Sequence, residues 1–404
     1  MTSSGPLLTL SRFVRLYQDG ERTYVEAVLG ERSLALEPTL ETMLRALASA
    51  PLPVGELLAR VSGAGTGNQG LAMAQLSAMM DLGLAIPSDD EDRARYQRAL
   101  TDPAPFPVID QVEVTNHCPM TCVMCSRGCA PTRRPLGFMD PALFAELVTQ
   151  IADAQRGTKP LTLHNAGEPL LHRALEQLVR VAAQARLRPE LSTNPAHLTL
   201  DRYLALRDAG LARVVLSLDG MSARTLHAIR GPAARFERAM ANIDAILAYR
   251  ASHQEREPVL VLQMLRLDLN RDEHLPFIER FGGLHDVGAI AYLKDLDAGT
   301  DPALAPDAAL APPFFCRAPW RSLVVLWDGR VVPCCYDPEG LAVVGDLRRQ
   351  SMSEIWRGSV LDELRARLQE GDPDPQGPCV HCVHRPDRFQ RPSLDVVPFE
   401  PLHW

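Results

Sequence analysis

From residue 108 onward, short apolar segments typical of strands alternate with segments typical of helices. Where strands and helices alternate in this way, the strands pair in parallel and the helices cover the sheet. The sequence therefore predicts an α/β fold whose parallel sheet closes fully or partly into a barrel, with functional groups at the carboxyl ends of the strands. The expected strands are residues 112–114, 160–163, 189–193, 213–218, 259–267 and 287–293, and the expected helices are residues 141–154, 175–184, 200–209 and 236–248.

Residues 1–90 carry a different pattern and predict a small separate domain. Two β-rich stretches, 13–17 and 23–28, flank Asp19-Gly20, which is a hairpin signal. A third short strand is expected at 34–36. Helical patterns follow from residue 38, over 54–61 and over 71–82.

Nine cysteines fall into two groups, four within 118–129 and five within 316–382. The N-terminus has no basic region followed by an apolar stretch, so no secretion signal is expected. Grouped cysteines in such a chain favour metal binding over disulfides. Cys118, Cys122 and Cys125 have the spacing C-x3-C-x2-C. Three thiolates leave one iron of a four-iron cluster open to another ligand, which is typical of a reactive centre; the alternatives are a zinc site and unrelated buried thiols.

The spacing of these three cysteines resembles the signature of the radical S-adenosylmethionine (SAM) superfamily. In that family the amino and carboxylate groups of SAM occupy the open iron of a [4Fe-4S] cluster. The resemblance implies a partial (β/α)6 TIM-type barrel with Cys118, Cys122 and Cys125 as the cluster ligands. It also implies reductive cleavage of SAM to a 5′-deoxyadenosyl radical that abstracts a substrate hydrogen, while the protein supplies orientation.

Stretches at later strand ends are similar to the SAM-binding motifs of this family. Gly167-Glu168-Pro169 resembles the G-G-E-P motif, with Ala166 in place of the first glycine, and implies a carboxylate that receives the SAM ammonium. The other implied SAM contacts are Ser192, Asn194, Ser217 and Arg230 for its polar groups, and Met124 and Met264 for its adenine. The alternatives are a surface turn at Glu168, a helix cap at Asn194, a surface ion pair for Arg230 and ordinary core packing for Met264.

Residues 306–384 hold the second group of cysteines. A hairpin with strands 322–327 and 330–333 is expected there, followed by a helix over 353–368 and a C-x2-C pair. This order resembles the SPASM auxiliary-cluster domain in its shortened form, called a twitch domain, because no cysteine follows Cys382. The resemblance implies a second [4Fe-4S] cluster, with a zinc site as the alternative. The implied ligands are Cys316, Cys334, Cys379 and Cys382.

Cys129 and Cys335 are left outside both ligand sets. Neighbouring residues on a strand face opposite sides, so only one of Cys334 and Cys335 is expected to face the metal. Cys335 is a candidate catalytic residue that returns a hydrogen atom to a substrate carbon. Cys129 is a second, less favoured candidate for the same role. The alternative for both is a small buried residue.

Two resemblances indicate different substrates. The hairpin-then-helices order of residues 1–90 resembles the winged-helix domain that precedes many peptide-modifying radical SAM enzymes, and implies a ribosomal precursor peptide whose leader adds a strand to the hairpin edge. A packing or dimerisation domain is the alternative. The short auxiliary domain instead resembles that of enzymes that oxidise or epimerise sugars and aminocyclitols. We therefore expect an oxidoreductase or epimerase acting on a peptide or natural-product intermediate; the alternative from another class is a non-catalytic iron–sulfur electron carrier.

Composition limits these interpretations further. The net charge of −8 argues against a nucleic-acid partner. The sequence has no long uncharged apolar run of the kind that predicts a membrane helix, so a cytoplasmic protein is expected. The resemblance implies a reductant such as flavodoxin or ferredoxin. The expected divisions are residues 1–90, a linker at 91–107, the barrel at 108–305, the auxiliary domain at 306–384 and a tail at 385–404.

Overall fold

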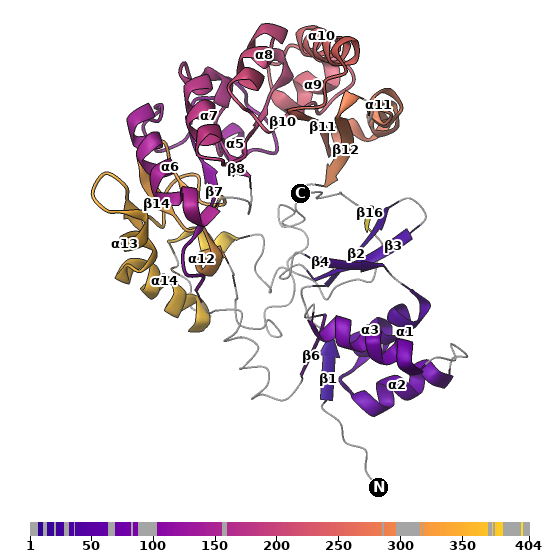
Figure 1. The fold of residues 1–404 in the computed structure, drawn as a ribbon. Helices are drawn as coiled ribbons and strands as arrows, with labels where there is room; N and C mark the ends of the chain where they lie inside the picture. Colours follow the sequence, from indigo (N-terminus) through magenta and orange to yellow (C-terminus); the bar gives the residue numbers. More distant parts are fainter. Residues whose placement is uncertain are drawn as a thin grey trace. The chain divides into compact units, whose positions relative to one another are not determined.

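The computed structural model describes residues 7–87, 103–295, 316–382 and 397–398, apart from gaps at 11–13, 20–21, 28–31, 36, 64–68, 82–83, 156–159, 285–286, 317, 371–373 and 375. These residues divide into two compact units, which we describe one at a time (Figure 1). The first holds the described residues up to Pro87 together with Val397–Pro398. The second holds the described residues from Pro103 to Cys382.

The first unit contains two small sheets. In one, β2 (Val14–Asp19) and β3 (Arg22–Ala27) form an antiparallel hairpin, with β4 (Arg32–Ala35) beside β3 and β16 (Val397–Pro398) beside β2. The expected hairpin and third strand are thus confirmed. In the other sheet, β1 (Leu7–Leu10) lies between β5 (Leu52–Pro53) and β6 (Ala85–Pro87). The sequence did not predict this second sheet, because strands this short carry no clear alternation.

Three helices complete the first unit and confirm the expected helical patterns. They are α1 (Pro38–Ser49), α2 (Val54–Gly63) and α3 (Gln69–Asp81). Proline at the first position of α1 suits its fixed φ. Apolar residues spaced three or four apart place one face of α1 in the core. That core joins the three helices to β1 and includes Leu8, Met43, Leu57 and Met79.

The second unit is built on one nine-stranded sheet. Six parallel strands lie in the order β12-β11-β10-β9-β8-β7, so each expected β/α repeat adds its strand beside the one before. The sheet then continues through three further strands, of which the first pairs in parallel with β7 and the other two are antiparallel. Their bounds are β7 (Val108–Val112), β8 (Leu161–Thr162), β9 (Pro189–Thr193), β10 (Arg213–Ser217), β11 (Val259–Arg266), β12 (Ala289–Asp295), β13 (Ser322–Val325), β14 (Arg330–Val332) and β15 (Gly345–Asp346).

The sheet order of the second unit is that of a partial barrel. Within the described residues β12 and β15 stand at its two ends and do not pair with each other, which confirms an α/β fold with an incompletely closed sheet. One expected strand is misplaced, because β7 covers 108–112 and not 112–114. The polar residues Asp110 and Gln111 interrupt the apolar pattern by which strands are predicted, so the sequence did not indicate the start of β7.

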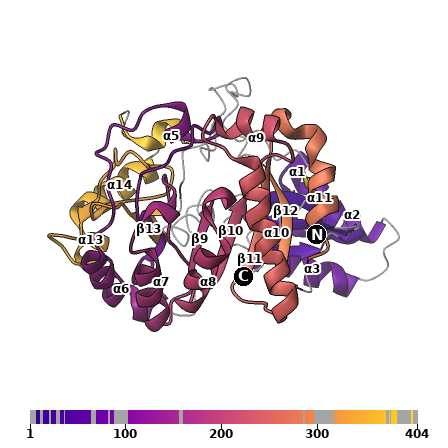
Figure 2. The ribbon, with the colours of Figure 1, turned by 90° about the horizontal axis from the view of Figure 1, so that it is seen from above.

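Helices cover one face of this sheet, where α6, α7, α8 and α10 follow one another (Figures 1 and 2). These four match the expected helices, and the Asp140 carboxylate caps the start of α6 by accepting the Ala142 amide at 2.7 Å. The sequence did not predict α9 or α11. The bounds are α5 (Ser126–Cys129), α6 (Pro141–Gln155), α7 (Leu175–Gln184), α8 (Leu200–Asp208), α9 (Ala223–Arg230), α10 (Phe236–His253), α11 (His274–Phe281) and α12 (Ala318–Arg321).

The single helix expected over 353–368 is wrong, because two helices lie there. They are α13 (Met352–Trp356) and α14 (Ser359–Glu370). Ser351 and Glu354 form a capping box that starts α13, and this helix ends at Trp356, before Gly358. The Gly358 carbonyl then accepts the amides of Leu361 and Asp362 and so begins α14. Glycine is a poor helix former, which favours the break at this position.

Alternation along the parallel strands separates the two faces of the sheet. Leu216, Leu260 and Leu262 lie in the core that the helices share with the sheet. Ser217 and Gln263, which pair across β10 and β11, have the opposite parity and so face away from the helices. This inner face carries the polar residues at the carboxyl ends of the strands.

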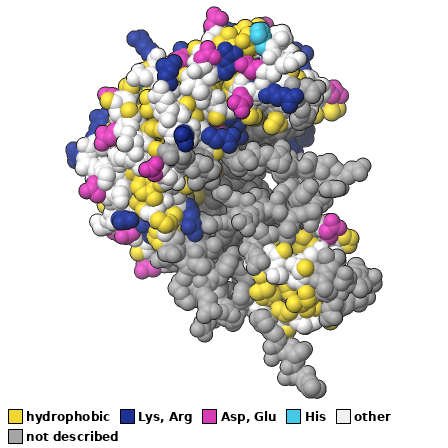
Figure 3. Space-filling view, in the orientation of Figure 1, with side chains coloured by type: hydrophobic (Ala, Val, Ile, Leu, Met, Phe, Trp, Pro, Cys, Tyr) yellow, Lys and Arg dark blue, Asp and Glu magenta, His cyan; other side chains and the backbone are white. Residues whose placement is uncertain are grey.

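Two surface features complete the description. Basic and acidic side chains are interspersed on the face of the second unit seen in Figure 3. Within the described part of the chain, no helix has the length and apolarity needed to span a bilayer.

Candidate active site

Cys118, Cys122 and Cys125 lie in the loop between β7 and α5, and Cys129 is the last residue of α5. Cys122 is buried, whereas Cys118 and Cys125 are partly exposed, and Cys125 stands at the N-cap of α5. The C-terminal turn of α9 holds this loop, because the Val123 amide donates to the Ile229 carbonyl at 2.9 Å. Gly128 packs so tightly that a Cβ there would lie 2.2 Å from the Cys122 carbonyl oxygen. The loop backbone is therefore fixed on two sides.

The three thiols influence one another electrostatically. Burial, with smaller contributions from the charges of Glu168, Cys122 and Cys125, raises the pKa of Cys118 to about 11. Burial also raises the pKa of Cys122, against the positive charge of Arg230. A bound cation reverses such shifts, because metal binding deprotonates thiols. The donor set therefore fits an iron–sulfur cluster, with one thiolate for each of three irons.

Glu168 lies beside this loop. Its amide donates to the His117 carbonyl at 2.8 Å, directly before Cys118. Glu168 as a whole residue is 4% exposed. One carboxylate oxygen accepts the Thr193 hydroxyl at 2.5 Å and the Leu170 amide at 3.1 Å, and the other accepts the Asn194 amide at 3.0 Å. Burial raises the pKa of Glu168, and these hydrogen bonds oppose the shift.

The ends of β9 and β10 bring further predicted residues together. The Ser192 and Ser217 hydroxyls lie 3.0 Å apart, so these two predicted SAM contacts are neighbours. The Asn194 side-chain oxygen caps the short 3-10 helix η2 (Pro195–His197) by accepting the Ala196 amide. Its Nδ2 is buried without a hydrogen-bond partner among the described residues, and so is Nδ2 of Asn165. Two orphaned donors near Glu168 fit a polar ligand that the chain does not supply itself.

Arg230, at the end of α9, forms a buried ion pair with Asp219. Asp219 is fully buried, and its other oxygen accepts the Leu265 amide at 2.9 Å. The sequence predicts a SAM contact or a surface ion pair for Arg230, and it predicts no role for Asp219. The pair is instead buried, and its guanidinium is near enough to Cys122 to influence that thiol. A lone carboxylate after an apolar strand was the signal for Asp219.

The remaining predicted SAM contacts, Met124, Gly167, Pro169 and Met264, do not all lie on the inner face of the sheet. Pro169 begins the 3-10 helix η1 (Pro169–Leu171) and is buried, and Met124 lies partly exposed in the cysteine loop. A Cβ on Gly167 would lie 2.0 Å from the Thr115 carbonyl oxygen, so backbone packing alone requires this glycine. Met264 is fully buried in the core with Leu262, on the helix-covered face. The structure does not bring Met264 to the face that carries Ser217.

The second cysteine group is also gathered in one place. Cys316, Cys379 and Cys382 pack around Trp320 and Leu368. Burial, with smaller contributions from the charges of Cys382, Cys379 and Cys335, raises the pKa of Cys316 to about 12. Burial likewise raises the pKa of Cys334 well above its ordinary value, with Cys316 as the strongest neighbouring charge. This donor set fits a second metal cluster.

The strand argument for Cys334 and Cys335 is wrong, because neither residue lies on a strand. β14 ends at Val332, since Pro333 has no amide to continue the ladder, and both cysteines lie in the turn that follows. The charge of Cys335 raises the pKa of Cys316, and the charges of Cys316 and Cys335 raise the pKa of Cys334, so both thiols lie near Cys316. Cys335 packs against an apolar cluster that includes Leu326 and Val332. Strand alternation therefore does not choose between them.

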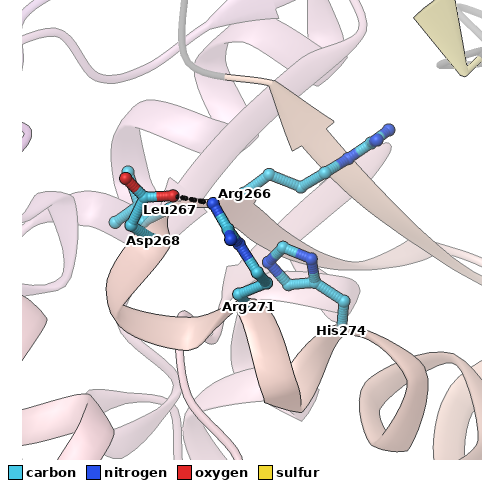
Figure 4. A pocket seen from close by; sticks show the side chains of 5 residues that line it. All are labelled: Arg266, Leu267, Asp268, Arg271 and His274. Atoms are coloured by element: carbon cyan, nitrogen blue, oxygen red, sulfur yellow. Dashed lines mark hydrogen bonds and ion pairs between the residues drawn. The ribbon is translucent and has the colours of Figure 1, made fainter.

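The hollows lined by described residues of the second unit include the following two. One of about 430 Å³ is lined by Ser126, next to Cys125, and by residues of the second cysteine region, including Tyr336, Leu341 and Cys382. The other, of about 370 Å³, lies at the carboxyl end of β11 (Figure 4). It is lined by Arg266, Leu267, Asp268, Arg271 and His274. Among the described residues, no three His, Cys, Asp or Glu side chains gather as ligands of one single ion. The assignment of ligands and SAM contacts stays a prediction.

Comparison with known proteins agrees with this architecture. The radical SAM superfamily matches residues 112–264, and the SPASM iron–sulfur cluster-binding domain matches residues 316–383. The chain is 26% identical over 274 residues to the S-adenosyl-L-methionine-dependent 2-deoxy-scyllo-inosamine dehydrogenase of Niallia circulans, covering 67% of this chain and 91% of that protein. It is 26% identical over 314 residues to the PqqA peptide cyclase of Rhodopseudomonas palustris, covering 69% of this chain and 80% of that protein.

A solved structure, that of Streptococcus suis SuiB bound to S-adenosylmethionine, has a similar fold. It matches with a TM-score of 0.50 at 11% identity and covers 89% of this chain and 90% of that one. The two matched domains imply [4Fe-4S] clusters and SAM as cofactors. The chain belongs to the radical SAM superfamily and carries a C-terminal SPASM-type iron–sulfur domain.

Proposed function

We propose that this chain cleaves SAM at a cluster held by Cys118, Cys122 and Cys125, and abstracts hydrogen from a ribosomal peptide or a natural-product intermediate. The observation that carries this is the position of Glu168, whose backbone is bonded to the residue before Cys118 and whose carboxylate is held by the end of β9. An electron carrier has no need of a fixed carboxylate and orphaned amide donors beside its cluster. This favours a cofactor pocket over the carrier alternative.

The chain's own residues bind and orient in this proposal. When bound, the cluster and SAM together supply a radical able to attack an unactivated C–H bond. Glu168 keeps acceptor capacity for an ammonium group, because its three hydrogen bonds leave part of the carboxylate free. The orphaned Nδ2 groups of Asn165 and Asn194 are donors for a carboxylate or ribose oxygen. Ser192 and Ser217 add hydroxyls on the inner face.

In this proposal, a cluster held by the second cysteine group accepts the electron that remains after hydrogen abstraction. Cys316, Cys334, Cys379 and Cys382 are its proposed ligands, with Cys335 as a candidate hydrogen donor. Oxidation, cross-linking and epimerisation are all reactions that such an arrangement supports. The auxiliary hairpin belongs to the same sheet as the barrel strands, so both sites lie in one packed unit.

A peptide substrate is favoured by two observations. The chain is similar over 69% of its length to a peptide cyclase. In the first unit, β4 has β3 as its one strand partner within the described residues, so its other edge is a place where an extended leader peptide adds a strand. The winged-helix interpretation of this unit is part of the proposal. The similarity to an aminocyclitol dehydrogenase over 67% of the chain supports a sugar or aminocyclitol as the second candidate.

The test is anaerobic reconstitution followed by SAM and dithionite. We expect 5′-deoxyadenosine from the wild-type chain and from Cys129→Ala, which lies outside the three-cysteine spacing, but none from Cys118→Ala. Equal yields from the wild type and Cys118→Ala would exclude the enzyme. Iron content near eight per chain is expected for two clusters, and about four would remove the auxiliary cluster. Incubation with a precursor peptide or an aminocyclitol then separates the two substrate classes by product mass.

A further inference from the structure

We propose that Glu113 and Arg134 form a buried tie that fixes the spacing between the two cysteine-bearing loops. The proposal rests on the proposed function, because it needs both thiol groups to hold clusters. Any one-electron exchange between two clusters falls steeply as their separation grows, so this spacing is a functional quantity. Both residues act through the loops that they hold and are therefore positioning residues.

Glu113 joins the barrel to the auxiliary hairpin. It follows the last residue of β7 and is fully buried. Its amide donates to the Val325 carbonyl of β13 at 2.8 Å. Its carboxylate accepts the Trp327 amide at 3.2 Å. One residue thus bonds to the hairpin through both its backbone and its side chain, five positions before Cys118.

Arg134 adds the segment that follows the first cysteine group. Its Nη2 donates to both Glu113 oxygens, at 2.6 and 2.8 Å, and its side chain is 4% exposed. Two residues earlier in this segment, the Thr132 hydroxyl donates to Glu339 at 3.0 Å, and the Arg133 amide donates to the same oxygen at 2.8 Å. Glu339 lies in the loop that carries Cys334, in the second of its two successive turns. The segment after the first loop is therefore bonded to the second loop.

The same segment is bonded on its other side to the residues just before Cys118. The Thr115 hydroxyl donates to the Gly137 carbonyl at 2.7 Å, and the Gly137 amide donates to the Asn116 side-chain oxygen at 2.9 Å. Gly137 also lies against the Trp327 ring, where a Cβ would come within 2.3 Å. Residues 132–139 are thus held between the approach to the first cysteine loop and the hairpin of the second.

The Glu113–Arg134 ion pair is better suited to fixing the position of the hairpin than to raising the free energy of unfolding. A buried ion pair is often no more stabilising than apolar residues of similar size, because both charges must leave water. Its bonds are directional, however, because the one guanidinium nitrogen Nη2 donates to both carboxylate oxygens. Replacing the pair by apolar residues should therefore keep the fold while loosening the position of the hairpin.

The experiment measures the magnetic coupling between the two clusters in the reconstituted full chain, reduced with dithionite. The variants are Arg134→Met, Arg134→Lys and the double variant Glu113→Leu with Arg134→Met, which leaves no unpaired buried charge. The matched control is Arg202→Met, which removes a partly buried ion pair with Glu176 in the helix layer. Iron content and dithionite-driven 5′-deoxyadenosine are measured alongside.

We expect eight-iron samples of the double variant whose EPR splitting is shifted and broadened relative to wild type and Arg202→Met, with a partial return in Arg134→Lys. An unchanged splitting in both Met-containing variants would overturn the tie. Loss of the auxiliary cluster from the double variant, with the fold intact by circular dichroism, would also overturn it, because the pair would then serve cluster binding. A wild-type chain with about four irons refutes the auxiliary-cluster proposal instead, so the two failures are distinguishable.

Discussion

Replacing Glu168 by glutamine tests the proposed SAM pocket most directly. The carboxylate accepts three hydrogen bonds, from Thr193, Leu170 and Asn194. A carboxylate offers about four acceptor positions, so about one remains for an ammonium group. All three present partners of Glu168 are hydrogen-bond donors. In the Glu168→Gln variant the side-chain NH2 group is also a donor, so it faces at least one of them without forming a hydrogen bond. The variant therefore loses both a buried hydrogen bond and the charge that would attract SAM.

The magnitude follows from these contacts. A hydrogen bond to a charged group contributes about 1.5–3 kcal/mol, and the substitution removes one from the folded protein. If the ammonium of SAM uses the remaining acceptor position, its affinity loses a similar amount, which is about 10- to 100-fold in Kd. The loss should appear in SAM binding beyond any loss of stability.

Isothermal titration of SAM into the reconstituted chain measures this difference. Glu190→Gln is the matched control, since Glu190 is also a buried carboxylate, bonded to the Thr162 hydroxyl at 2.7 Å and paired with Arg213 at 2.8 Å. We expect both variants to unfold at lower urea concentration, and Glu168→Gln alone to lose SAM affinity. If Glu168→Gln bound SAM as tightly as Glu190→Gln, the assignment of this carboxylate would be refuted.

Three further outcomes follow from single contacts. Asp219→Asn leaves the Arg230 cation unpaired in the interior and should cost about 3–5 kcal/mol in urea denaturation, with 5′-deoxyadenosine formation also lost; a stable, active variant would contradict the pairing. Gly167→Ala forces a Cβ against a backbone oxygen and should cost about 1–3 kcal/mol, whereas Gly283→Ala, with nothing within 4 Å, should be near neutral, and equal effects would refute the packing argument. Burial lowers the pKa of His172 below 6.5, so its stabilising contribution is present above that pH and is lost as the pH falls through the lowered pKa. Denaturation of the metal-free chain at about pH 7.5 and about pH 5.5 should show this loss, and His172→Gln should reduce the difference; an equal difference in the variant would exclude His172 as its source.

Local signals were enough for most of the fold. The helices α7 and α10 and the strands β9 and β11 were predicted because each carries a long pattern of its own. The helix α9 was missed because it is short and buries only Leu226 and Ile229. The break at Gly358 was missed because a strong apolar pattern continues past it. Short elements and breaks depend on neighbours that are distant in the sequence.

The site was predictable where the motif is contiguous and not where it depends on pairing. The cysteine spacing and Gly167-Glu168-Pro169 are readable from the chain itself. The partners of Glu168, namely Thr193 and Asn194, come from another strand, and Asp219 is paired with Arg230 only after the α9 helix forms. Met264 shows the same limit, because a strand pattern gives alternation without saying which parity faces the helices.

The position of β13 explains how one chain brings two thiol groups into a single unit. β7 delivers the first cysteine loop, and β13 pairs with it in parallel, Val325 beside Val112. Without β13, the parallel sheet would end at β7 and leave a strand edge open. The auxiliary hairpin therefore completes the sheet that positions the first cysteine loop, and the residue after Val112 bonds directly to it. The spacing of the two cysteine groups is thus set by strand pairing first and by the side chains of Glu113 and Arg134 second.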